Sequence, residues 1–306
     1  MNVRHFLRLS DLRRDELDYI LHRTTILKEK HRQNVCYQPL QGKSLGMIFE
    51  KSSTRTRVSF EAGMAQLGGH AIFLSSRDTQ LGRGEPLEDV ARVLSRMVDL
   101  IMIRTDAHEK LERFARFSLV PVINGLSDIA HPCQLLADLY TFTEYRGNVT
   151  GKKIAWIGDS NNMCRSWMEA AALFKFQLAI ACPEGYAPDH EQLAAFAPYV
   201  RLYSDPLAAV EGAHLVVTDV WASMGFENEE EERKRAFASF QVNMATMKSA
   251  AKDAIFMHCL PAHRGEEVAA DVIDGPQSVV WDEAENRLHT QKALMEYLLL
   301  GKVDDK

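Results

Sequence analysis

The residues richest in possible chemistry lie in one segment, residues 51–57, which reads Lys-Ser-Ser-Thr-Arg-Thr-Arg. An apolar, strand-like run precedes this segment, and residues 58–67 follow it with apolar side chains at helical spacing. The free N–H groups and dipole of a helix start bind anions, and arginine adds charge-assisted hydrogen bonds. A helix cap needs only one hydroxyl, so the surplus of hydroxyls and guanidiniums predicts a phosphate-type anion site. No Gly-x4-Gly-Lys-Ser/Thr pattern is present, so a nucleotide triphosphatase is not indicated.

Three more polar sites follow predicted strands in the first half. Arg104 comes directly after the run 100–103, and His131-Pro132-Cys133-Gln134 opens a helix beyond the next strand. Gln80 lies in the loop 75–84. Each of these residue types is more often structural when it stands alone. Together, at the ends of strands of one sheet, they predict a pocket for an anion that carries a carbonyl group.

The second half has a matching set of polar residues. Residues 159–163, Asp-Ser-Asn-Asn-Met, follow the strand-like run 153–158, and Asp219 follows the run 214–218. Ser223-Met224-Gly225 comes four residues after Asp219. A nucleotide-binding interpretation of the turn after residue 158 is weak, because the Gly-x-Gly-x-x-Gly pattern is missing.

Cys259, in the run His258-Cys259-Leu260-Pro261, has three interpretations. It is a nucleophile if His131 or His258 serves as its base. It is a zinc ligand together with Cys133 and the nearby histidines, including His263, although no Cys-x2-Cys or His-Glu-x-x-His spacing is present. A chemically quiet cysteine is the default.

A strongly charged run, residues 229–235, contains four glutamates followed by Arg-Lys-Arg. Pairs four residues apart, such as Glu229 with Arg233, stabilise an exposed helix. We expect this run to be a solvated helix face without a role in chemistry.

The elements that carry these residues alternate between strands and helices, which is typical of parallel α/β sheets. The first half has expected strands at 44–50, 71–74, 100–103 and 119–123, with helices at 58–67, 87–94 and 111–117 between them. A polar, glycine-containing stretch at 145–151 predicts a boundary, after which expected strands recur at 153–157, 177–181, 214–217, 254–257 and 278–281. A final amphipathic helix is expected at 290–300. Ligands of such sheets bind beyond the carboxyl ends of the strands.

Composition excludes several classes of protein. The 306 residues are 46% hydrophobic and 25% charged, with a net charge of −6, which is ordinary for a globular protein and too mild for a polyanion binder. No apolar run approaches the roughly 18 residues of a membrane span, and residues 1–10 lack the continuous apolar stretch of a secretory signal. The five cysteines (Cys36, Cys133, Cys164, Cys182 and Cys259) are odd in number and scattered, which indicates a reducing cytoplasm.

At this point the chain resembles a known family. Residues 53–57 followed by Ser59-Phe60-Glu61, with His131-Pro132-Cys133-Gln134, are similar to motifs of the aspartate and ornithine carbamoyltransferases. The paired asparagines of 159–163, Asp219 with 223–225, and the His-Cys-Leu-Pro run are similar to the ornithine branch. The aspartate branch instead carries a His-Pro-Leu-Pro-Arg type of sequence, which is missing here. The resemblance extends from Phe6 to about Leu299.

The resemblance implies a role for each matching residue. It implies a carbamoyl phosphate site made of Ser53, Thr54, Arg55, Thr56, Gln80, Arg104, His131, Pro132, Cys133, Gln134, Cys259, Leu260 and Arg287. It implies ornithine-binding residues Asn162, Asp219, Ser223 and Met224, and catalytic roles for Arg55, Arg104, His131, Asp219 and Cys259. Gln80 would reach the site of a neighbouring subunit, because the family forms trimers with shared active sites. The position of Gln80 varies in the family, so its role is less firmly implied than that of Arg55.

The resemblance also implies the architecture and the reaction. We expect a carbamoyl phosphate-binding domain at 1–147 and an ornithine-binding domain at 148–306, each a mostly parallel sheet flanked by helices. The last helix, about 288–306, is expected to pack back on the first domain. The implied reaction makes L-citrulline and phosphate, as in arginine biosynthesis. The implied assembly is a cytoplasmic homotrimer that needs no metal or organic cofactor and binds no nucleic acid or membrane.

The alternatives are a carbamoyltransferase for putrescine or N-acetylornithine, a Rossmann-type dehydrogenase, and a non-catalytic paralogue. One departure, bulky Arg165 and Trp167 where many relatives have smaller residues, puts local helix packing in question.

Overall fold

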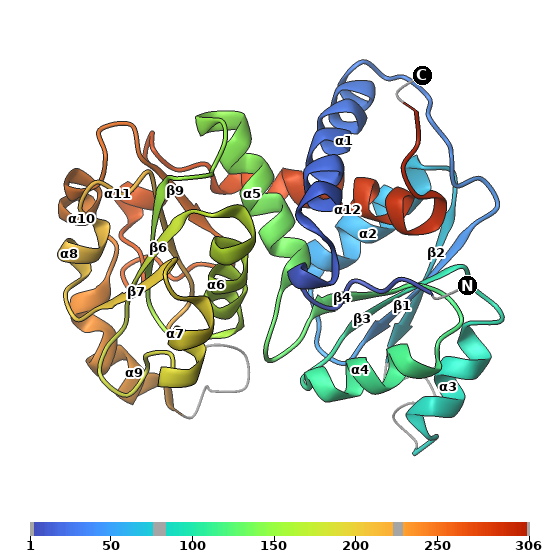
Figure 1. The fold of residues 1–306 in the computed structure, drawn as a ribbon, viewed down its shortest axis with the longest axis horizontal. Coiled ribbons are helices and arrows are strands. Elements are labelled where there is room, and N and C mark those ends of the chain that lie inside the picture. The colour runs from blue at the N-terminus through green and yellow to red at the C-terminus, as the bar shows by residue number, and fades with distance from the viewer. Residues whose placement is uncertain (1–2, 76–83, 223–228, 305–306) are drawn as a thin grey trace. The chain divides into compact units, whose positions relative to one another are not determined.

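The computed structural model describes residues 3–75, 84–222 and 229–304 (Figure 1). The chain divides into two compact units. Unit 1 contains Met1–Tyr140 and Glu285–Lys306, and unit 2 contains Thr141–Ala284. None of the helices in the described parts of the chain combines the length and apolarity needed to cross a bilayer.

Unit 1 is built on a four-stranded parallel sheet in the order β2-β1-β3-β4. Its strands are β1 (Ser44–Phe49), β2 (His70–Ser75), β3 (Leu100–Arg104) and β4 (Val122–Leu126). Phe49 pairs with Ser75 on one side and with Arg104 on the other, so the three strands end level with one another. Because all strands run in parallel, their carboxyl ends form one edge of the sheet, where α/β proteins place their ligands.

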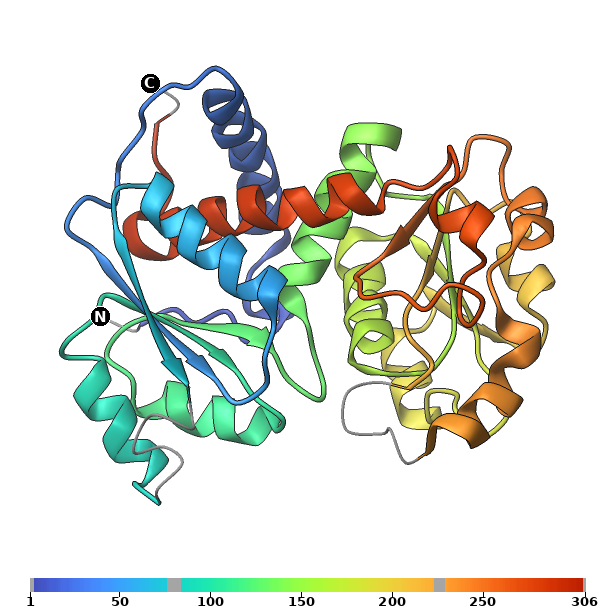
Figure 2. The same cartoon turned by 180° about the vertical axis from the view of Figure 1, so that it is seen from behind.

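The helices of unit 1 cover both faces of this sheet. They are α1 (Arg14–Arg32), α2 (Thr54–Gln66), α3 (Leu87–Leu94), α4 (His108–Phe117), the first part of α5 (Pro132–Arg146) and most of α12 (Val280–Leu300). Figures 1 and 2 show α3 and α4 together on one face, with α1, α2 and α12 on the other. Buried side chains such as Ile101, Phe114 and Val122 fill the space under α3 and α4.

Helix α12 returns the end of the chain to unit 1, as the sequence predicts. The Arg23 guanidinium donates from Nε to Glu296 Oε2 over 2.6 Å, and both side chains are 1% exposed. A Cβ atom at Gly63 would lie 3.2 Å from side-chain atoms of both Lys292 and Met295, so α2 and α12 pack closely at this glycine. Breaking a buried ion pair of this kind typically costs about 3–5 kcal/mol, so Arg23 and Glu296 hold α12 firmly against α1.

Unit 2 is built on a five-stranded parallel sheet in the order β7-β6-β5-β8-β9. Its strands are β5 (Lys153–Ile157), β6 (Gln177–Ala181), β7 (Val200–Tyr203), β8 (Leu215–Thr218) and β9 (Ile255–His258). Its helices are α6 (Asn162–Phe174), α7 (His190–Phe196), α8 (Pro206–Val210), α9 (Glu230–Phe237), α10 (Met244–Ser249) and α11 (Ala270–Ile273). The expectation of two parallel sheets flanked by helices is therefore confirmed.

Two expected strands differ from the structure. The strand expected at 278–281 is wrong, because Ser278 makes only an isolated bridge with Phe256 and α12 begins at Val280. Asp282 and Glu283 lie in the first turn of this helix, where acidic side chains are favourable. The strand expected at 119–123 instead spans Val122–Leu126, directly after Pro121, which has no N–H for a sheet ladder.

The bulky residues at the start of α6 fit the core of unit 2. Cys164 and Trp167 are fully buried, and the Trp167 ring meets the Phe176 ring edge-on at a centroid distance of 5.9 Å. Trp167 is therefore accommodated inside unit 2, whereas Arg165 is half-buried.

Candidate functional site

The first turn of α2 carries the hydroxyl-rich and arginine-rich segment. Ser53 is the N-cap, with an extended backbone, and its side chain accepts a hydrogen bond of 3.2 Å from the Thr56 backbone N–H. Thr54, Arg55 and Thr56 therefore lie in the first turn, beside the free N–H groups of the helix start. This segment follows β1, so it stands at the carboxyl edge of the sheet in unit 1.

The imidazole of His131 lies within the electrostatic influence of three guanidiniums. Arg104 is the last residue of β3, and His131 directly precedes Pro132, the first residue of α5. Burial lowers the pKa of His131 well below its ordinary value, and the positive charges of Arg287, Arg104 and Arg55 lower it further. The imidazole is therefore neutral at physiological pH, and it can donate a hydrogen bond without giving up a proton.

Arg287 is held by residues from two other helices. Its Nη1 donates to Gln134 Oε1 over 2.6 Å, and its Nη2 donates to Thr56 Oγ1 over 3.3 Å. Gln134 in turn donates from Nε2 to Asp138 Oδ1 over 2.8 Å. Gln291, with its amide oxygen facing the guanidinium, accepts from Arg287 Nη2 over 2.9 Å. Three of the residues implied to bind carbamoyl phosphate, Thr56, Gln134 and Arg287, are thus linked by one buried hydrogen-bond network.

Cys133 lies beside this network without the properties of a reactive thiol. Its side chain is fully buried, and Sγ donates to the Asn124 carbonyl over 3.3 Å. Burial raises the pKa of Cys133 to about 12, so the thiol stays protonated. The structure therefore favours the interpretation of Cys133 as a chemically quiet residue over a zinc ligand.

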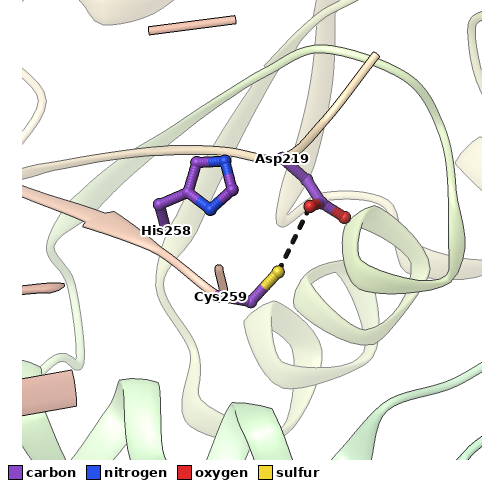
Figure 3. Close-up of side chains that lie close together, drawn as sticks. All are labelled: Asp219, His258 and Cys259. Carbon is purple, nitrogen blue, oxygen red and sulfur yellow. Dashed lines mark hydrogen bonds between the residues drawn. The ribbon is translucent and has the colours of Figure 1, made fainter. Parts of the chain in front are cut away.

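In unit 2, Asp219 is the centre of a second polar cluster (Figure 3). It follows β8 and is 8% exposed. Its Oδ1 accepts from Cys259 Sγ over 3.2 Å and from the Val220 backbone N–H over 2.8 Å. Its Oδ2 accepts from Asn161 Nδ2 over 2.7 Å. Three donors therefore fix the carboxylate at the carboxyl edge of this sheet.

His258 already has a partner at each ring nitrogen. Its Nδ1 accepts from the Leu260 backbone N–H over 2.9 Å, and its Nε2 lies 3.1 Å from Glu267 Oε1. Ligand atoms of Asp219, His258 and Cys259 lie within 4.8 Å of one another, a spacing that suits a metal ion. Both nitrogens of the His258 ring are nevertheless engaged, by the Leu260 N–H and by Glu267, so the ring fits neither a metal-ligand role nor a base for Cys259.

Leu260 has a left-handed backbone, with φ at 58°. This conformation is uncommon for a residue with a branched side chain, and strained residues cluster at functional sites. It follows Cys259 directly, so the turn that holds the thiol against Asp219 is a strained one.

Asn161 is a site residue that the sequence analysis passed over in favour of Asn162. Asn161 is the N-cap of α6, and its Oδ1 accepts from the N–H groups of Met163 and Cys164 while Nδ2 donates to Asp219. Asn162 is the first helical residue and is half-buried. The signal for Asn161 was the strong preference for asparagine at a helix cap.

Arg233 contradicts the interpretation of 229–235 as a wholly solvated face. Its Nε does pair with Glu229 over 3.0 Å, as expected. Its Nη1, however, donates to Asp159 Oδ2 over 2.8 Å and to the Trp221 carbonyl over 2.9 Å, and the residue is 7% exposed. Arg233 therefore ties α9 to the loop after β5.

Three further predicted site residues, Gln80, Ser223 and Met224, lie outside the described residues.

Two family models match the first and second parts of the chain separately. Residues 4–144 match the family model described as the aspartate/ornithine carbamoyltransferase carbamoyl-P binding domain, and residues 150–298 match the Asp/Orn binding domain of the same family. An ornithine carbamoyltransferase of Halorhodospira halophila is 64% identical over 299 residues, which cover 98% of this chain and 100% of the relative.

Solved structures give the same result. The ornithine carbamoyltransferase of Burkholderia thailandensis is 57% identical with a TM-score of 0.92, and the match covers 98% of this chain and 100% of that one. The enzyme of the same name from Pyrococcus furiosus is 49% identical with a TM-score of 0.92, covering 98% of each chain. The chain belongs to the aspartate/ornithine carbamoyltransferase family.

Proposed function

We propose that this chain is an enzyme that transfers the carbamoyl group of carbamoyl phosphate to the δ-amine of L-ornithine, giving L-citrulline and phosphate. The observation that carries the reaction class is the buried Arg287, bonded to Gln134 and Thr56, beside a His131 imidazole kept neutral by burial and by the charges of Arg287, Arg104 and Arg55. The choice of ornithine is supported by relatives that carry this activity in their names at 64% and 62% identity. Formation of citrulline is a step of arginine biosynthesis.

The residues of unit 1 suit carbamoyl phosphate. Its phosphate would be bound by Ser53, Thr54, Arg55 and Thr56, and its carbamoyl group by Arg104, His131, Gln134 and Arg287, with Pro132 and Cys133 shaping the wall. Attack on the carbamoyl carbon creates an oxyanion, and donors aimed at such an oxygen supply much of the rate in enzymes of this kind. A neutral His131 contributes a hydrogen bond there, while the guanidiniums contribute charge.

The residues of unit 2 suit the amino acid. The Asp219 carboxylate would pair with the α-ammonium of ornithine, and Asn162, Ser223 and Met224 would complete its pocket. Cys259 and Leu260 would lie where the δ-amine meets the carbamoyl group. The amine nitrogen forms the new bond to carbon, the bond from carbon to the phosphate oxygen breaks, and phosphate leaves with that electron pair and accepts the proton. A free alkylamine has a pKa near 10.4, so the site must favour the neutral amine.

The test is product formation with matched amines. Purified protein would be incubated with carbamoyl phosphate and, separately, ornithine, putrescine, N-acetylornithine and aspartate, with phosphate and the carbamoylated product measured. We expect rapid citrulline formation with ornithine alone, unchanged by a metal chelator. Faster turnover of another amine would overturn the role of Asp219. Binding of carbamoyl phosphate without any transfer would indicate a non-catalytic paralogue.

We also propose a homotrimer with shared active sites. Support comes from β2, which is an edge strand and whose Ile72 and Phe73 side chains are 40% and 37% exposed. Val58 on the adjoining helix is 55% exposed. An exposed apolar edge strand invites pairing or coverage by another chain. Gln80 follows β2 in the chain, so it would be carried toward a neighbouring copy.

Mixing two inactive variants tests this assembly. Arg55→Ala removes an anion ligand from a copy's own site, and Gln80→Ala removes the residue proposed to act in the neighbour's site. Shared sites predict that co-refolded mixtures regain activity that neither parent has, in a particle with the mass of three chains. A monomeric mass, or mixtures no more active than their parents, would contradict the proposal.

The proposed division of labour places carbamoyl phosphate binding in residues 1–147, completed by Arg287 from the returning helix α12, and ornithine binding in residues 148–306. This division is supported by two family-model matches, of which the first ends at residue 144 and the second begins at residue 150.

A cytoplasmic location is supported by the five cysteines of the chain, all of which are free thiols. Cell fractionation with an antibody to the chain would test the location.

A further inference from the structure

A cavity of about 200 Å³ lies in unit 1, between the end of α1, the connection to β1, the end of α2, and α12. Figures 1 and 2 both show these three helices side by side. The cavity is separate from the candidate carbamoyl phosphate residues, and the nearest of these along α12 is Arg287, five residues or about 7.5 Å before Lys292. Gln66, which lines it, is at the opposite end of α2 from Thr54, about 18 Å away at 1.5 Å per residue.

The lining of this cavity contains basic side chains and no acidic one. Three of its ten lining residues are Lys30, His31 and Lys292, and none of the ten is acidic. His31 is exposed and Lys30 is half-buried, so these two form the mouth. Lys292 is 4% exposed and forms the floor. The cavity therefore offers an anion a solvent-accessible entrance and a buried cation.

The Lys292 ammonium has only a neutral partner among the described residues. Its Nζ donates to Gln66 Oε1 over 2.9 Å, and no carboxylate of the described chain pairs with it. Burial lowers the pKa of Lys292 to about 8, with no opposing attraction from an acid. Lysines are almost never fully buried unless a counter-charge accompanies them. An anion in the cavity would supply that counter-charge.

The charges behind the cavity add to the same positive field. Lys28 is buried and donates to the neutral amide of Asn286 over 2.7 Å. His289 packs its ring 5.5 Å from the His31 ring, and burial together with Lys292, Lys28 and His31 lowers the pKa of His289 to about 3. Glu296, an acid of the same helix, is already paired with Arg23. Glu285 Oε1 lies 3.3 Å from His289 Nε2, while Lys292 and Lys28 bring two buried amines to this part of unit 1.

The size of the cavity limits the anion to a small one. By this measure a single water needs about 10–15 Å³, so the cavity has room for a small ion together with several waters. Pockets for drug-sized or nucleotide-sized ligands are roughly 300–1,000 Å³. We propose that this cavity is a second anion-binding site, in which Lys292, Lys30 and His31 bind a small oxyanion of the phosphate class apart from the candidate active site.

Titration calorimetry with inorganic phosphate tests this site directly. Because phosphate would also occupy the active site as a product, the background is Arg55→Ala, which disables that site. We expect one remaining site in Arg55→Ala, lost in Arg55→Ala/Lys292→Met and weakened about tenfold in Arg55→Ala/Lys30→Gln. The exposed Lys252 provides the matched control, Arg55→Ala/Lys252→Gln, which should bind as the background does.

Proton uptake gives a readout that a merely structural lysine would not produce. At pH 8, near the pKa of Lys292, about half of the Lys292 amines carry a proton. A bound anion favours the protonated amine, so binding should take up about half a proton per site. This uptake makes the measured binding enthalpy differ between buffers of different ionisation enthalpy. Parallel titrations with acetate distinguish phosphate from carboxylate sources. Absence of a site in Arg55→Ala, or equal affinity in the folded Lys292→Met or Lys30→Gln forms, would overturn the proposal whether or not the protein turns over ornithine.

Discussion

Arg287 Nη1 donates to Gln134 Oε1 over 2.6 Å, a hydrogen bond between residues 153 positions apart in the chain. It joins the last helix to the helix that begins at Pro132, because Arg287 belongs to α12 and Gln134 to the first turn of α5. The same guanidinium donates to Thr56 in the first turn of α2. One side chain of the last helix is therefore bonded to the first turns of two helices that follow strands of the first sheet.

Replacing Arg287 should mainly weaken carbamoyl phosphate binding. Arg287→Met removes a charge and leaves Gln134 without its donor, and hydrogen bonds to charged groups are worth about 1.5–3 kcal/mol. We expect the KM for carbamoyl phosphate to rise roughly 10- to 100-fold, with a much smaller change in the KM for ornithine. Arg287→Lys should restore little, because lysine lacks the planar fork of donors. Steady-state kinetics in both substrates, with Arg264→Met as an exposed control, checks this; an unchanged KM in Arg287→Met contradicts it.

The sequence predicts those parts of the site that follow local rules. Parallel strands followed by polar residues predict the clustering of Arg55, Arg104 and His131, because the strand ends share one edge. Apolar spacing alone does not separate a short strand from the start of a buried helix, which is why residues 278–281 were assigned wrongly. Nor does a pattern of pairs four residues apart reveal Asp159, the partner of Arg233 that lies 74 residues away.

Long-range contacts also decide between adjacent residues of one motif. The sequence shows two asparagines, Asn161 and Asn162, and helix starts cannot be located to one residue from propensity. The capping bond to Met163 and the bond to Asp219 distinguish Asn161 in the structure. Asp219 follows β8 and lies 58 residues after Asn161 in the chain. The bond between them forms because β5 and β8 are neighbours in the sheet, which the sequence does not show.

Replacing Asp219 should affect the amino acid and leave the anion site intact. Asp219→Asn removes the charge proposed to pair with the α-ammonium, and it faces an amide N–H₂ toward the donors of Asn161, Val220 or Cys259. We expect kcat/KM for ornithine to fall at least 100-fold, while the Kd for carbamoyl phosphate stays within twofold. Equilibrium binding and kinetics measured on the same preparation separate the two effects. Asp274→Asn, which alters an exposed acid paired with Arg264, is the matched control.

Cys259 should act as a hydrogen-bond donor to Asp219, with no need for sulfur chemistry. Cys259→Ser keeps a donor at this position, whereas Cys259→Ala removes it from a nearly buried carboxylate. We expect the serine variant to retain kcat/KM within about tenfold and the alanine variant to lose roughly a further tenfold. The pH–rate profile of Cys259→Ser should keep the limbs of the unmodified protein. A limb that disappears with the sulfur would mean that the thiol titrates in the reaction.

His289 should make the stability of the protein depend on pH. The side chain is 1% exposed, and burial, helped by the charges of Lys292 and Lys28, lowers its pKa to about 3 from an ordinary value near 6.5. Between these values the unfolded chain holds a proton on His289 that the folded chain excludes, so the unfolded state binds more protons. The free energy of unfolding therefore falls as the pH falls below 6.5, by up to about 1.4 kcal/mol per pH unit from this one residue.

His289→Gln removes that contribution, so the variant should lose less stability from pH 7 to pH 5 than the unmodified protein does. Urea unfolding at pH 7, 6 and 5 measures the difference, with His190→Gln at an exposed position as the control. Equal pH slopes for His289→Gln and the unmodified protein would show that the buried imidazole is protonated alike in the folded and unfolded states.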